Sequence, residues 1–261
     1  MWNGKTVSVV LMTYAERDSI RGVIDGFSGT GLVDEVLVVD NNAEPGTREE
    51  VAKTSARVVH ESSQGYGFAT RRGLIESDGE LVVLAEPDGT FLPEDLTKLL
   101  VYSNECDVVF GTRTTRELIW ADANMDWFLR WGNWAVAKLI EMLFNTSHLS
   151  DVGCTFRLLR REMADHVAAN MRVGGNHAAV EIMLLTIVSG TRFVEVPVNY
   201  LPRVGVSSVT GKRIEAIRVG LRMVELILHF RRQSPRRLMK APAFGHARSM
   251  NGEEVHEHVS L

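Results

Sequence analysis

The sequence predicts an α/β protein built on a mostly parallel sheet. Short runs rich in Val and Leu recur along the first half of the chain, and each run is continuously apolar, as is typical of strands covered on both faces. Helical patterns separate these runs, and this alternation favours a sheet with helices on both faces. Such a sheet binds its ligands where the strands end.

The expected strands are 7–13, 36–40, 58–61, 81–86 and 108–111, with a later one inside 191–200. The expected helices are 17–26, 47–54, 67–77, 93–103, 125–144, 176–189 and 212–230. The helix at 93 begins with a proline, which suits a first helical turn. We expect SDVGCTFRLLRRE, residues 150–162, to form a compact stretch between helices, and 233–261 to be a disordered tail, because periodicity is lost there.

Composition narrows the class of protein. A chain of 261 residues with 45% apolar side chains can bury a sizeable core. The net charge of −4 argues against a nucleic-acid partner, so phosphate binding must come from clustered arginines. Cys106 and Cys154 match no disulfide or zinc spacing and are expected to be reduced thiols. No run reaches the ~20 apolar residues of a transmembrane helix, so we expect a cytoplasmic protein, soluble or peripheral on the membrane face.

Polar residues follow three of the expected strands. The first strand is followed by TYAERD, the second ends in DNNAEPGT and the fourth is followed by EPDGT. In a parallel sheet these ends lie on one edge, so four distant acids can converge there: Glu16, Asp40, Glu86 and Asp88. The alternative is that each acid caps the helix that follows it. The glycine-rich QGYGFATRRG after the third strand favours a shared site.

Glu86 and Asp88 alternate on a short turn, which suits a divalent cation such as Mg²⁺ or Mn²⁺. These ions take oxygen ligands and share them with phosphate groups, whereas zinc favours His or Cys, which this turn lacks. At an effective dielectric of about 20, two unit charges ~4 Å apart interact by roughly 4 kcal/mol, so bare carboxylates would repel a diphosphate. The cation is therefore the expected mediator between these acids and a phosphorylated ligand.

Seven segments, in a fixed order, carry a resemblance to a known family. They are VVLMTYAERDSI, EVLVVDNNAEPGT, QGYGFATRRGL, LAEPDGTFLPED, VVFGTR, SDVGCTFRLLRRE and EVPVNYLPRVGVSS. Between residues 7 and 210 the chain resembles inverting glycosyltransferases of family 2, which have a GT-A fold. More narrowly it is similar to the branch that includes dolichyl-phosphate mannose synthase and bacterial polyprenyl-phosphate sugar transferases.

The resemblance implies a GT-A domain over 1–232, with a nucleotide-sugar half, 1–115, and an acceptor half, 116–232. The implied nucleotide-binding residues are Thr13, Tyr14, Glu16, Asp40, Gly65, Glu86 and Asp88. The implied ligands of Mg²⁺ or Mn²⁺ are Glu86, Asp88 and Thr90. The chain departs from the family pattern at Ala15, where Asn is usual, at DNN, where DDG or DDS is usual, and at Glu86, where Asp is usual.

Arginines gather in the segments after the acidic motif. The resemblance implies that the acceptor phosphate is bound by Arg113, Arg130, Arg203 and Ser207, and that Asp88, Asp151 and Arg203 take part in catalysis. Planar guanidinium groups suit bidentate phosphate binding. For Arg116 and Arg157, phosphate binding and a solvated charge are equally good interpretations.

The type of acceptor decides whether a base is needed. A phosphate monoester, with a second pKa of about 6, is already ionised at neutral pH, whereas a hydroxyl must lose a proton during attack. Asp151 is the candidate base for a hydroxyl acceptor, and its alternative role is to bond the turn around Gly153.

The helices expected at 125–144 and 212–230 are amphipathic, with narrow polar stripes. The first carries Trp127, Trp131 and Trp134, and the second ends in basic residues. These features suit an anionic membrane surface. The alternatives are that both helices complete the core or are buried in a homodimer.

Together these features predict an inverting, metal-dependent glycosyltransferase that moves a sugar from a nucleoside-diphosphate sugar, GDP-mannose or a UDP-sugar, to a polyprenyl phosphate or another membrane-associated acceptor. One alternative is a soluble transferase acting on a hydroxyl, and another is a non-catalytic nucleotide-sugar-binding protein. A sugar nucleotidyltransferase would need a Gly-rich, basic loop after the first strand, and LMTYAERDSI has no glycine.

Overall fold

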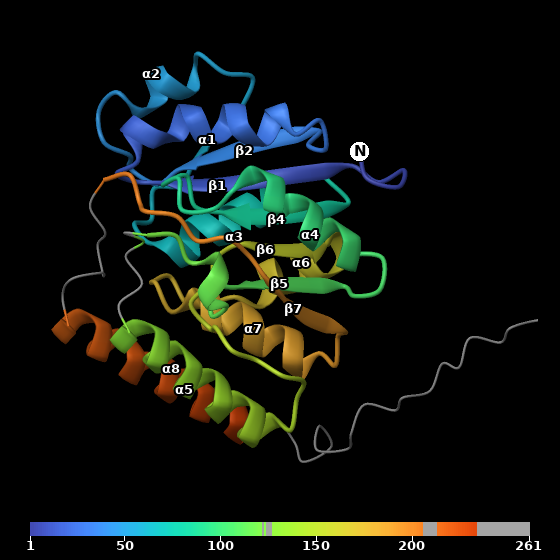
Figure 1. Ribbon diagram of the computed structural model, residues 1–261, viewed down its shortest axis with the longest axis vertical. Helices are drawn as coiled ribbons and strands as arrows, with labels where there is room; N and C mark the ends of the chain where they lie inside the picture. The colour runs from blue at the N-terminus through green and yellow to red at the C-terminus, as the bar shows by residue number, and fades with distance from the viewer. Residues whose placement is uncertain (122, 124–126, 206–212, 234–261) are drawn as a thin grey trace, which may run out of the picture.

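The computed structural model describes residues 1–121, 123, 127–205 and 213–233. Its centre is a seven-stranded sheet with the strand order β3-β2-β1-β4-β6-β5-β7 (Figure 1). The strands are β1 (Val7–Thr13), β2 (Glu35–Asp40), β3 (Arg57–His60), β4 (Leu81–Ala85), β5 (Val108–Thr112), β6 (Arg157–Arg160) and β7 (Phe193–Pro197). Strand β6 runs antiparallel to both its neighbours, and the remaining pairs are parallel. The α/β fold class predicted from the sequence is thus confirmed.

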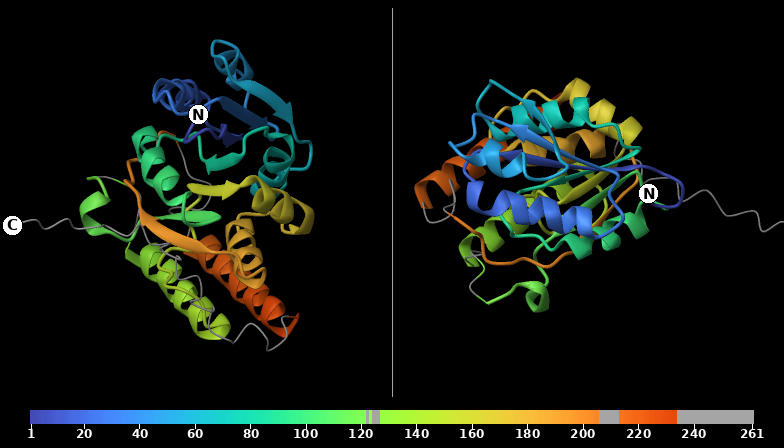
Figure 2. Two further views of the ribbon diagram at one scale, coloured as in Figure 1. Left: turned by 90° about the vertical axis from the view of Figure 1, so that its right-hand side faces the viewer. Right: turned by 90° about the horizontal axis from the view of Figure 1, so that it is seen from above.

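The helices are α1 (Arg17–Gly29), α2 (Thr47–Val51), α3 (Tyr66–Glu76), α4 (Leu96–Tyr102), α5 (Trp127–Phe144), α6 (Arg161–Asn170), α7 (Ala178–Val188) and α8 (Arg213–Gln233), with short 3₁₀ turns η1 (Pro93–Asp95) and η2 (Arg116–Leu118). Helices α1 and α4 cover one face of the sheet, while α3, α6 and α7 cover the other. Helices α5 and α8 lie side by side at the end of the molecule remote from α1 and α2, packed toward α7 (Figures 1 and 2).

Strand β1 shows why continuous apolar runs form this sheet. All seven of its residues are buried. Val9 and Leu11 pack into the core beneath α1, and Val10 and Met12 pack into the core on the opposite face. Burial of each such side chain contributes roughly 1.5–3 kcal/mol, which favours a mostly apolar sequence in a strand that faces a helix layer on both sides.

The stretch 150–162 differs from the expectation, because it contains β6 and the start of α6 rather than a compact connection. Strand β6 is the four-residue segment RLLR, which is too short and too charged at its ends to show a strand period. Its insertion between β4 and β5 depends on pairing with distant residues.

Two further boundaries bear on the expectations. Helix α8 continues to Gln233, one residue into the segment expected to be disordered, and residues 234–261 lie outside the described part of the chain. Within the described residues, we find no helix that combines the length and the apolar character needed to cross a membrane.

Candidate active site

The carboxyl ends of β1, β2 and β4 lie together on one edge of the sheet. Thr13 at the end of β1 pairs with Asp40 at the end of β2, and Leu11 pairs with Ala85 at the end of β4. The loops after these strands are therefore neighbours, as the sequence predicts for parallel strands. At the helices that follow, α1, α2 and η1, the N-cap residue makes no side-chain capping hydrogen bond, so the alternative that these acids merely cap them is wrong.

The turn after β4 presents two carboxylates. Asp88 is fully buried, and its Oδ1 accepts hydrogen bonds from the Thr90 amide at 3.0 Å and the Thr90 hydroxyl at 2.6 Å. Gly89 has φ +78°, a conformation that glycine adopts without strain. Glu86 is half-buried. Its removal from water, together with the Asp88 charge, raises the pKa of Glu86 above the usual glutamate range. Such a pair favours a bound cation.

Arg203 lies between this turn and the loop after β1. Its Nε is 3.3 Å from Asp88 Oδ2, and its Nη2 is 3.2 Å from Glu16 Oε1. Burial would lower the pKa of Arg203, but the carboxylates of Asp88 and Glu86 raise it further than burial lowers it. The Arg203 guanidinium thus bridges the loops after β1 and β4, although Arg203 itself lies 187 residues from Glu16 in the sequence.

Backbone hydrogen bonds hold Arg203 in this position. The Leu201 amide donates to Thr90 O, and the Val204 amide donates to Asp88 O, both at 2.9 Å. On the other side, Glu16 Oε2 accepts from the amides of Tyr14 at 2.8 Å and Ala15 at 2.9 Å. Both carboxylates that Arg203 contacts are therefore fixed in their own loops.

The donor set at this edge fits Mg²⁺ or Mn²⁺ bound jointly with a ligand. Among the described residues there is no group of three or more His, Cys, Asp or Glu that could hold a metal. Glu86 and Asp88 supply two carboxylates, and Mg²⁺ is usually bound by one or two carboxylates together with substrate phosphates. The Thr90 hydroxyl donates its hydrogen bond to Asp88, so in this structure Thr90 orients the Asp88 carboxylate.

Asp40 is buried and organises the loop after β2. Its Oδ1 accepts from the Ala43 amide at 2.8 Å, and its Oδ2 accepts from Arg48 Nε. Burial would raise the pKa of Asp40, but the Ala43 amide and the Arg48 guanidinium outweigh it and lower that pKa. The described side chain of Asp40 therefore faces its own loop.

Asn41 is a site residue that the sequence reasoning missed. Its Nδ2 donates to Glu61 O at 2.9 Å and Ser63 O at 2.8 Å, and its Oδ1 accepts from the Gly65 amide at 2.8 Å. Asn41 thus fixes the loop between β3 and α3 against the end of β2. The available signal was the DNN motif, noted only as a departure from the family pattern.

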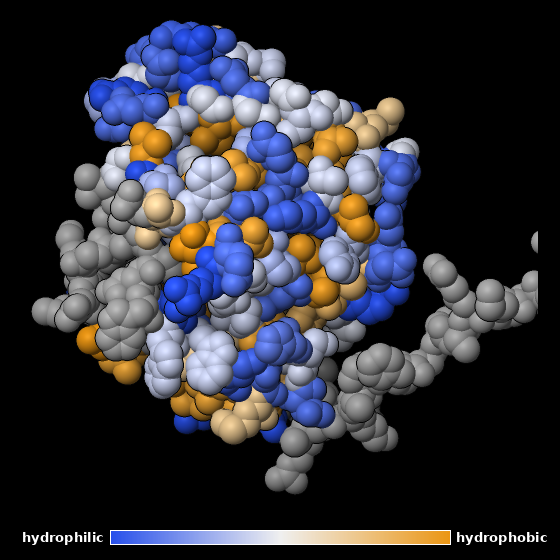
Figure 3. Space-filling view, viewed as in Figure 1, coloured by the Kyte–Doolittle hydropathy of each residue, from blue (hydrophilic) through white to orange (hydrophobic). Residues whose placement is uncertain are grey.

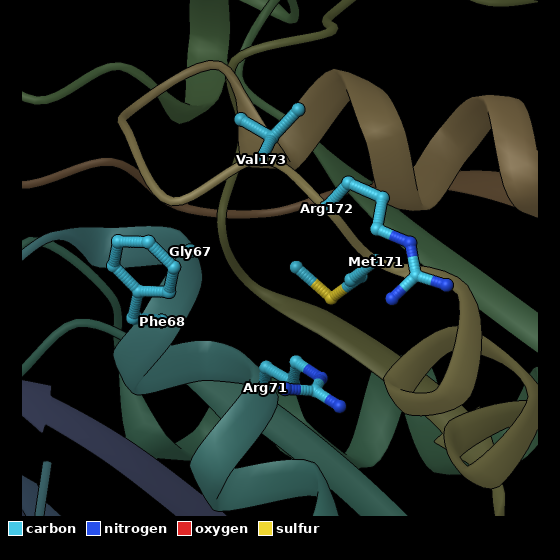
Figure 4. A pocket seen from close by; sticks show the side chains of 6 residues that line it. All are labelled: Gly67, Phe68, Arg71, Met171, Arg172 and Val173. Carbon is cyan, nitrogen blue, oxygen red and sulfur yellow. The ribbon is translucent and has the colours of Figure 1, made fainter. Parts of the chain in front are cut away.

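The expected site residue Gly65 lies where two loops approach closely. Gly65 has φ +147°, and a Cβ at this position would lie 2.2 Å from Gly174 O. The Gly67 amide donates to Gly174 O at 2.9 Å. A pocket beside this contact is lined by residues of α3 and of the loop after α6: Gly67, Phe68, Arg71, Met171, Arg172 and Val173 (Figure 4). Its lining is separate from the carboxylates at the strand ends.

Arg113 and Asp151 form a buried bidentate pair on the other side of the site. Arg113 Nε is 2.8 Å from Asp151 Oδ2, and Nη2 is 3.0 Å from Oδ1. Asp151 also accepts from the Arg113 amide at 3.1 Å and the Gly153 amide at 3.0 Å. Burial would raise the pKa of Asp151, but Arg113 and these amides lower it. The Arg113 guanidinium also lies over the Tyr200 ring, 5.1 Å from its centroid.

The other expected acceptor residues are placed differently. Arg130 is half-buried in the first turn of α5, Arg116 is exposed in η2, and Ser207 lies outside the described residues. Arg157 is fully buried in β6, where its three nitrogens donate to backbone carbonyls. Neither interpretation of Arg157, phosphate ligand or solvated charge, matches this position.

Comparison with known proteins identifies the family of the chain. Residues 8–168 match the model of glycosyl transferase family 2. The chain is 30% identical over 201 residues to the dolichyl-phosphate hexose transferase of Haloferax volcanii, covering 76% of this chain and 84% of that protein. It is also 30% identical to an uncharacterized glycosyltransferase of Mycobacterium tuberculosis, covering 80% and 91%.

A solved structure confirms the GT-A fold. The crystal structure of glucosyl-3-phosphoglycerate synthase from Mycobacterium tuberculosis in complex with Mn²⁺, UDP-glucose and phosphoglyceric acid matches with a TM-score of 0.70 and 20% identity, over 89% of this chain and 81% of that one. The family match covers more than half of the chain, and the relatives match over most of their length. The chain therefore belongs to glycosyl transferase family 2 and is a glycosyltransferase.

Proposed function

We propose that the protein is an inverting, metal-dependent transferase that moves a hexose from a nucleoside-diphosphate sugar to a polyprenyl phosphate. The observation that carries the proposal is the placement of Arg203 between Asp88 and Glu16, at the strand ends where the family's donor binds. The likeness to a dolichyl-phosphate hexose transferase supports a lipid-phosphate acceptor. The likeness to a structure solved with Mn²⁺ and UDP-glucose supports a nucleoside-diphosphate sugar as donor and a divalent metal.

On the donor side, Glu86 and Asp88 would hold Mg²⁺ or Mn²⁺, with Thr90 orienting Asp88. The ion would supply positive charge that stabilises the departing diphosphate. Arg203 can leave Asp88 when another cation neutralises that carboxylate, and its guanidinium can then bind a phosphate. Thr13, Tyr14, Glu16, Asp40 and Gly65 belong to the loops that would surround the nucleotide.

On the acceptor side, Arg113 is the main candidate for phosphate binding, with Arg130, Arg203 and Ser207 as further ones. We assign Asp151 the role of holding Arg113, because both of its oxygens are already engaged. A phosphate monoester attacks without losing a proton, so positioning and charge neutralisation suffice.

A second candidate function is transfer to a hydroxyl of a soluble acceptor, with Asp151 as base. The structural likeness to a synthase solved with phosphoglyceric acid favours it. In this chain an Asp151 base would first have to release Arg113.

Helices α5 and α8 support a membrane-associated acceptor. Trp131 is 64% exposed on α5, and Leu221 is 67% exposed on α8, where Arg222 is also exposed. Figure 3 shows apolar residues among hydrophilic ones at this end of the molecule. Aromatic, apolar and basic side chains together suit an anionic membrane surface.

Leu221→Glu should reduce sedimentation with anionic vesicles. Ile75→Glu, at an exposed site on α3, is the control and should not reduce it. Equal sedimentation of both variants would count against this surface.

The test is product analysis. The protein is incubated with Mn²⁺, a panel of GDP- and UDP-hexoses and either a short polyprenyl phosphate or phosphoglycerate, and products are identified by mass spectrometry. We expect a hexosyl lipid phosphate from one donor. Glycosylation of phosphoglycerate alone would favour the second candidate, and nucleotide-sugar binding without any product would overturn the transferase proposal.

A further inference from the structure

The turn formed by residues 150–154 is held from one side by the carboxylate of Glu195 on β7. Glu195 Oε2 accepts from the Ser150 amide and the Ser150 hydroxyl, each at 2.7 Å. Its Oε1 accepts from the Asp151 amide at 3.2 Å. The Ser150 hydroxyl also lies 2.8 Å from Thr112 Oγ1 at the end of β5. Glu195 thus binds the backbone amide groups of the turn.

The same turn is held from the other side by Arg157 on β6. Arg157 Nε donates to Cys154 O at 2.7 Å, and Nη2 donates to Val152 O at 3.1 Å. Its Nη1 donates to Ala179 O in the first turn of α7. The guanidinium also lies over the Phe110 ring, 5.0 Å from its centroid. Arg157 therefore binds the backbone carbonyl groups of the turn.

Among the described residues, neither side chain is paired with a group of opposite charge. In the part of the chain that the structure describes, Arg157 and Glu195 form no ion pair with each other or with another side chain. Burying an ionised group is costly unless its hydrogen bonds are satisfied, and here the backbone of one turn satisfies most of them. Glu195 and Arg157 therefore hold the same five-residue turn through hydrogen bonds to its amides and its carbonyls.

Asp151 lies between these two anchors, and it holds Arg113 in a bidentate pair. We propose that Glu195 and Arg157 are positioning residues that fix the 150–154 turn, so that Asp151 aims Arg113 at an anionic acceptor. The inference rests on the proposed function, in which Arg113 binds the acceptor phosphate. Glu195 and Arg157 act through the turn and do not touch the substrate.

The test is a double-mutant cycle between Glu195→Gln and Arg113→Ala. The glutamine has nearly the same shape but replaces one acceptor oxygen by an NH₂ group, which cannot accept the amide hydrogen bonds. We expect Glu195→Gln to raise the acceptor KM about tenfold, as loss of a hydrogen bond to a charged group does, with kcat and the donor KM nearly unchanged. In the Arg113→Ala background it should raise the acceptor KM no further.

The probes are a short polyprenyl phosphate and phosphoglycerate, and the KM is measured for whichever one the wild-type protein glycosylates. Glu35→Gln is the matched control, because Glu35 on β2 also accepts from a hydroxyl, that of Ser8, and from a backbone amide, that of Asp78. Glu35 lies at the opposite end of the sheet, so its variant should leave the acceptor KM unchanged. Arg157→Lys should act like Glu195→Gln, and thermal unfolding reports whether each variant folds.

The outcomes separate the two proposals. The positioning role would be overturned if Glu195→Gln raised the acceptor KM by the same factor in the wild-type and Arg113→Ala backgrounds. It would also be overturned if Glu195→Gln left the acceptor KM of the wild type unchanged. If Arg113→Ala leaves the KM unchanged, or if neither probe is glycosylated, the proposed function is wrong and the positioning role fails with it. If Arg113→Ala raises the KM and Glu195→Gln does not, only the positioning role is wrong.

Discussion

The proposed donor and acceptor sides of the site differ in how far apart in sequence their interacting residues lie. On the donor side, Asp88 is oriented by Thr90 and Glu16 by Tyr14, each pair two residues apart. On the acceptor side, Arg113 and Asp151 are 38 residues apart, and Ser150 and Glu195 are 45 apart. Donor loops are therefore shaped by their own sequence, whereas the acceptor side depends on the assembled sheet. Arg203 joins the two sides through its bridge to Glu16 and Asp88.

The largest effect is expected on the donor side, from Asp88→Asn. This change removes the charge that faces Arg203 and that would hold the cation. We expect turnover to fall by about 10²–10³, the range seen when one electrostatic contact to a transition state is lost. The measurement is product formation at saturating Mn²⁺. Asp25→Asn, at an exposed position on α1, is the control and should retain full activity.

The residue that joins the two sides should have the next largest effect. Arg203→Ala leaves Asp88 without its observed cationic partner, and truncating one partner of a buried charge pair costs about 2 kcal/mol or more, roughly 30-fold in kcat/KM. Arg192→Ala, at an exposed position beside β7, is the control. A kcat/KM equal to that of the wild type would show that the bridge has no part in binding or catalysis.

Asp151→Asn distinguishes the two roles of this residue on the acceptor side. If Asp151 holds Arg113, the acceptor KM should rise about tenfold, as expected for a lost charged hydrogen bond, with little change in kcat. If Asp151 is a general base, kcat should instead fall by about 10²–10⁴ at an unchanged KM. Steady-state kinetics with varied acceptor separate the outcomes, and the second one would contradict the assignment made here.

The smallest effect concerns stability. Burial raises the pKa of Glu195 from its ordinary 4.5 to about 7, so between these values the folded protein keeps a proton that the unfolded chain has released. The contribution of Glu195 to the free energy of unfolding therefore decreases as pH rises through this window. In urea unfolding at about pH 5 and about pH 7.5, Glu195→Gln should flatten the decrease. Identical pH dependence in wild type and variant would refute the shift.

The sequence predicts the donor side well because the physics there is local. Continuous apolar runs locate β1 to β5, and the rule that parallel strands end on one edge places the loops that carry Glu16, Asp40 and Asp88 side by side. What it does not show is Arg203 bridging Glu16 and Asp88, because that contact depends on the path of a distant segment.

The acceptor side is harder to predict for the same reason. The β6 segment RLLR has no period long enough to mark a strand. In FVEVP, Glu195 has the pattern of an ordinary outward-facing residue of a strand, and only the fold places it against Ser150. Arg157 is predicted as a surface or phosphate-binding charge, because the sequence does not show that its nitrogens meet backbone carbonyls inside the core.

The most direct test of the central claim is calorimetric binding of GDP and UDP with and without Mn²⁺, in the wild type and in Asp88→Asn. The claim is that the carboxylates of the EPDGT turn link a divalent cation to the diphosphate of the donor. We expect Mn²⁺ to tighten binding of one nucleoside diphosphate to the wild type, and this gain to disappear in Asp88→Asn. Equal binding with and without Mn²⁺ in the wild type would contradict the claim.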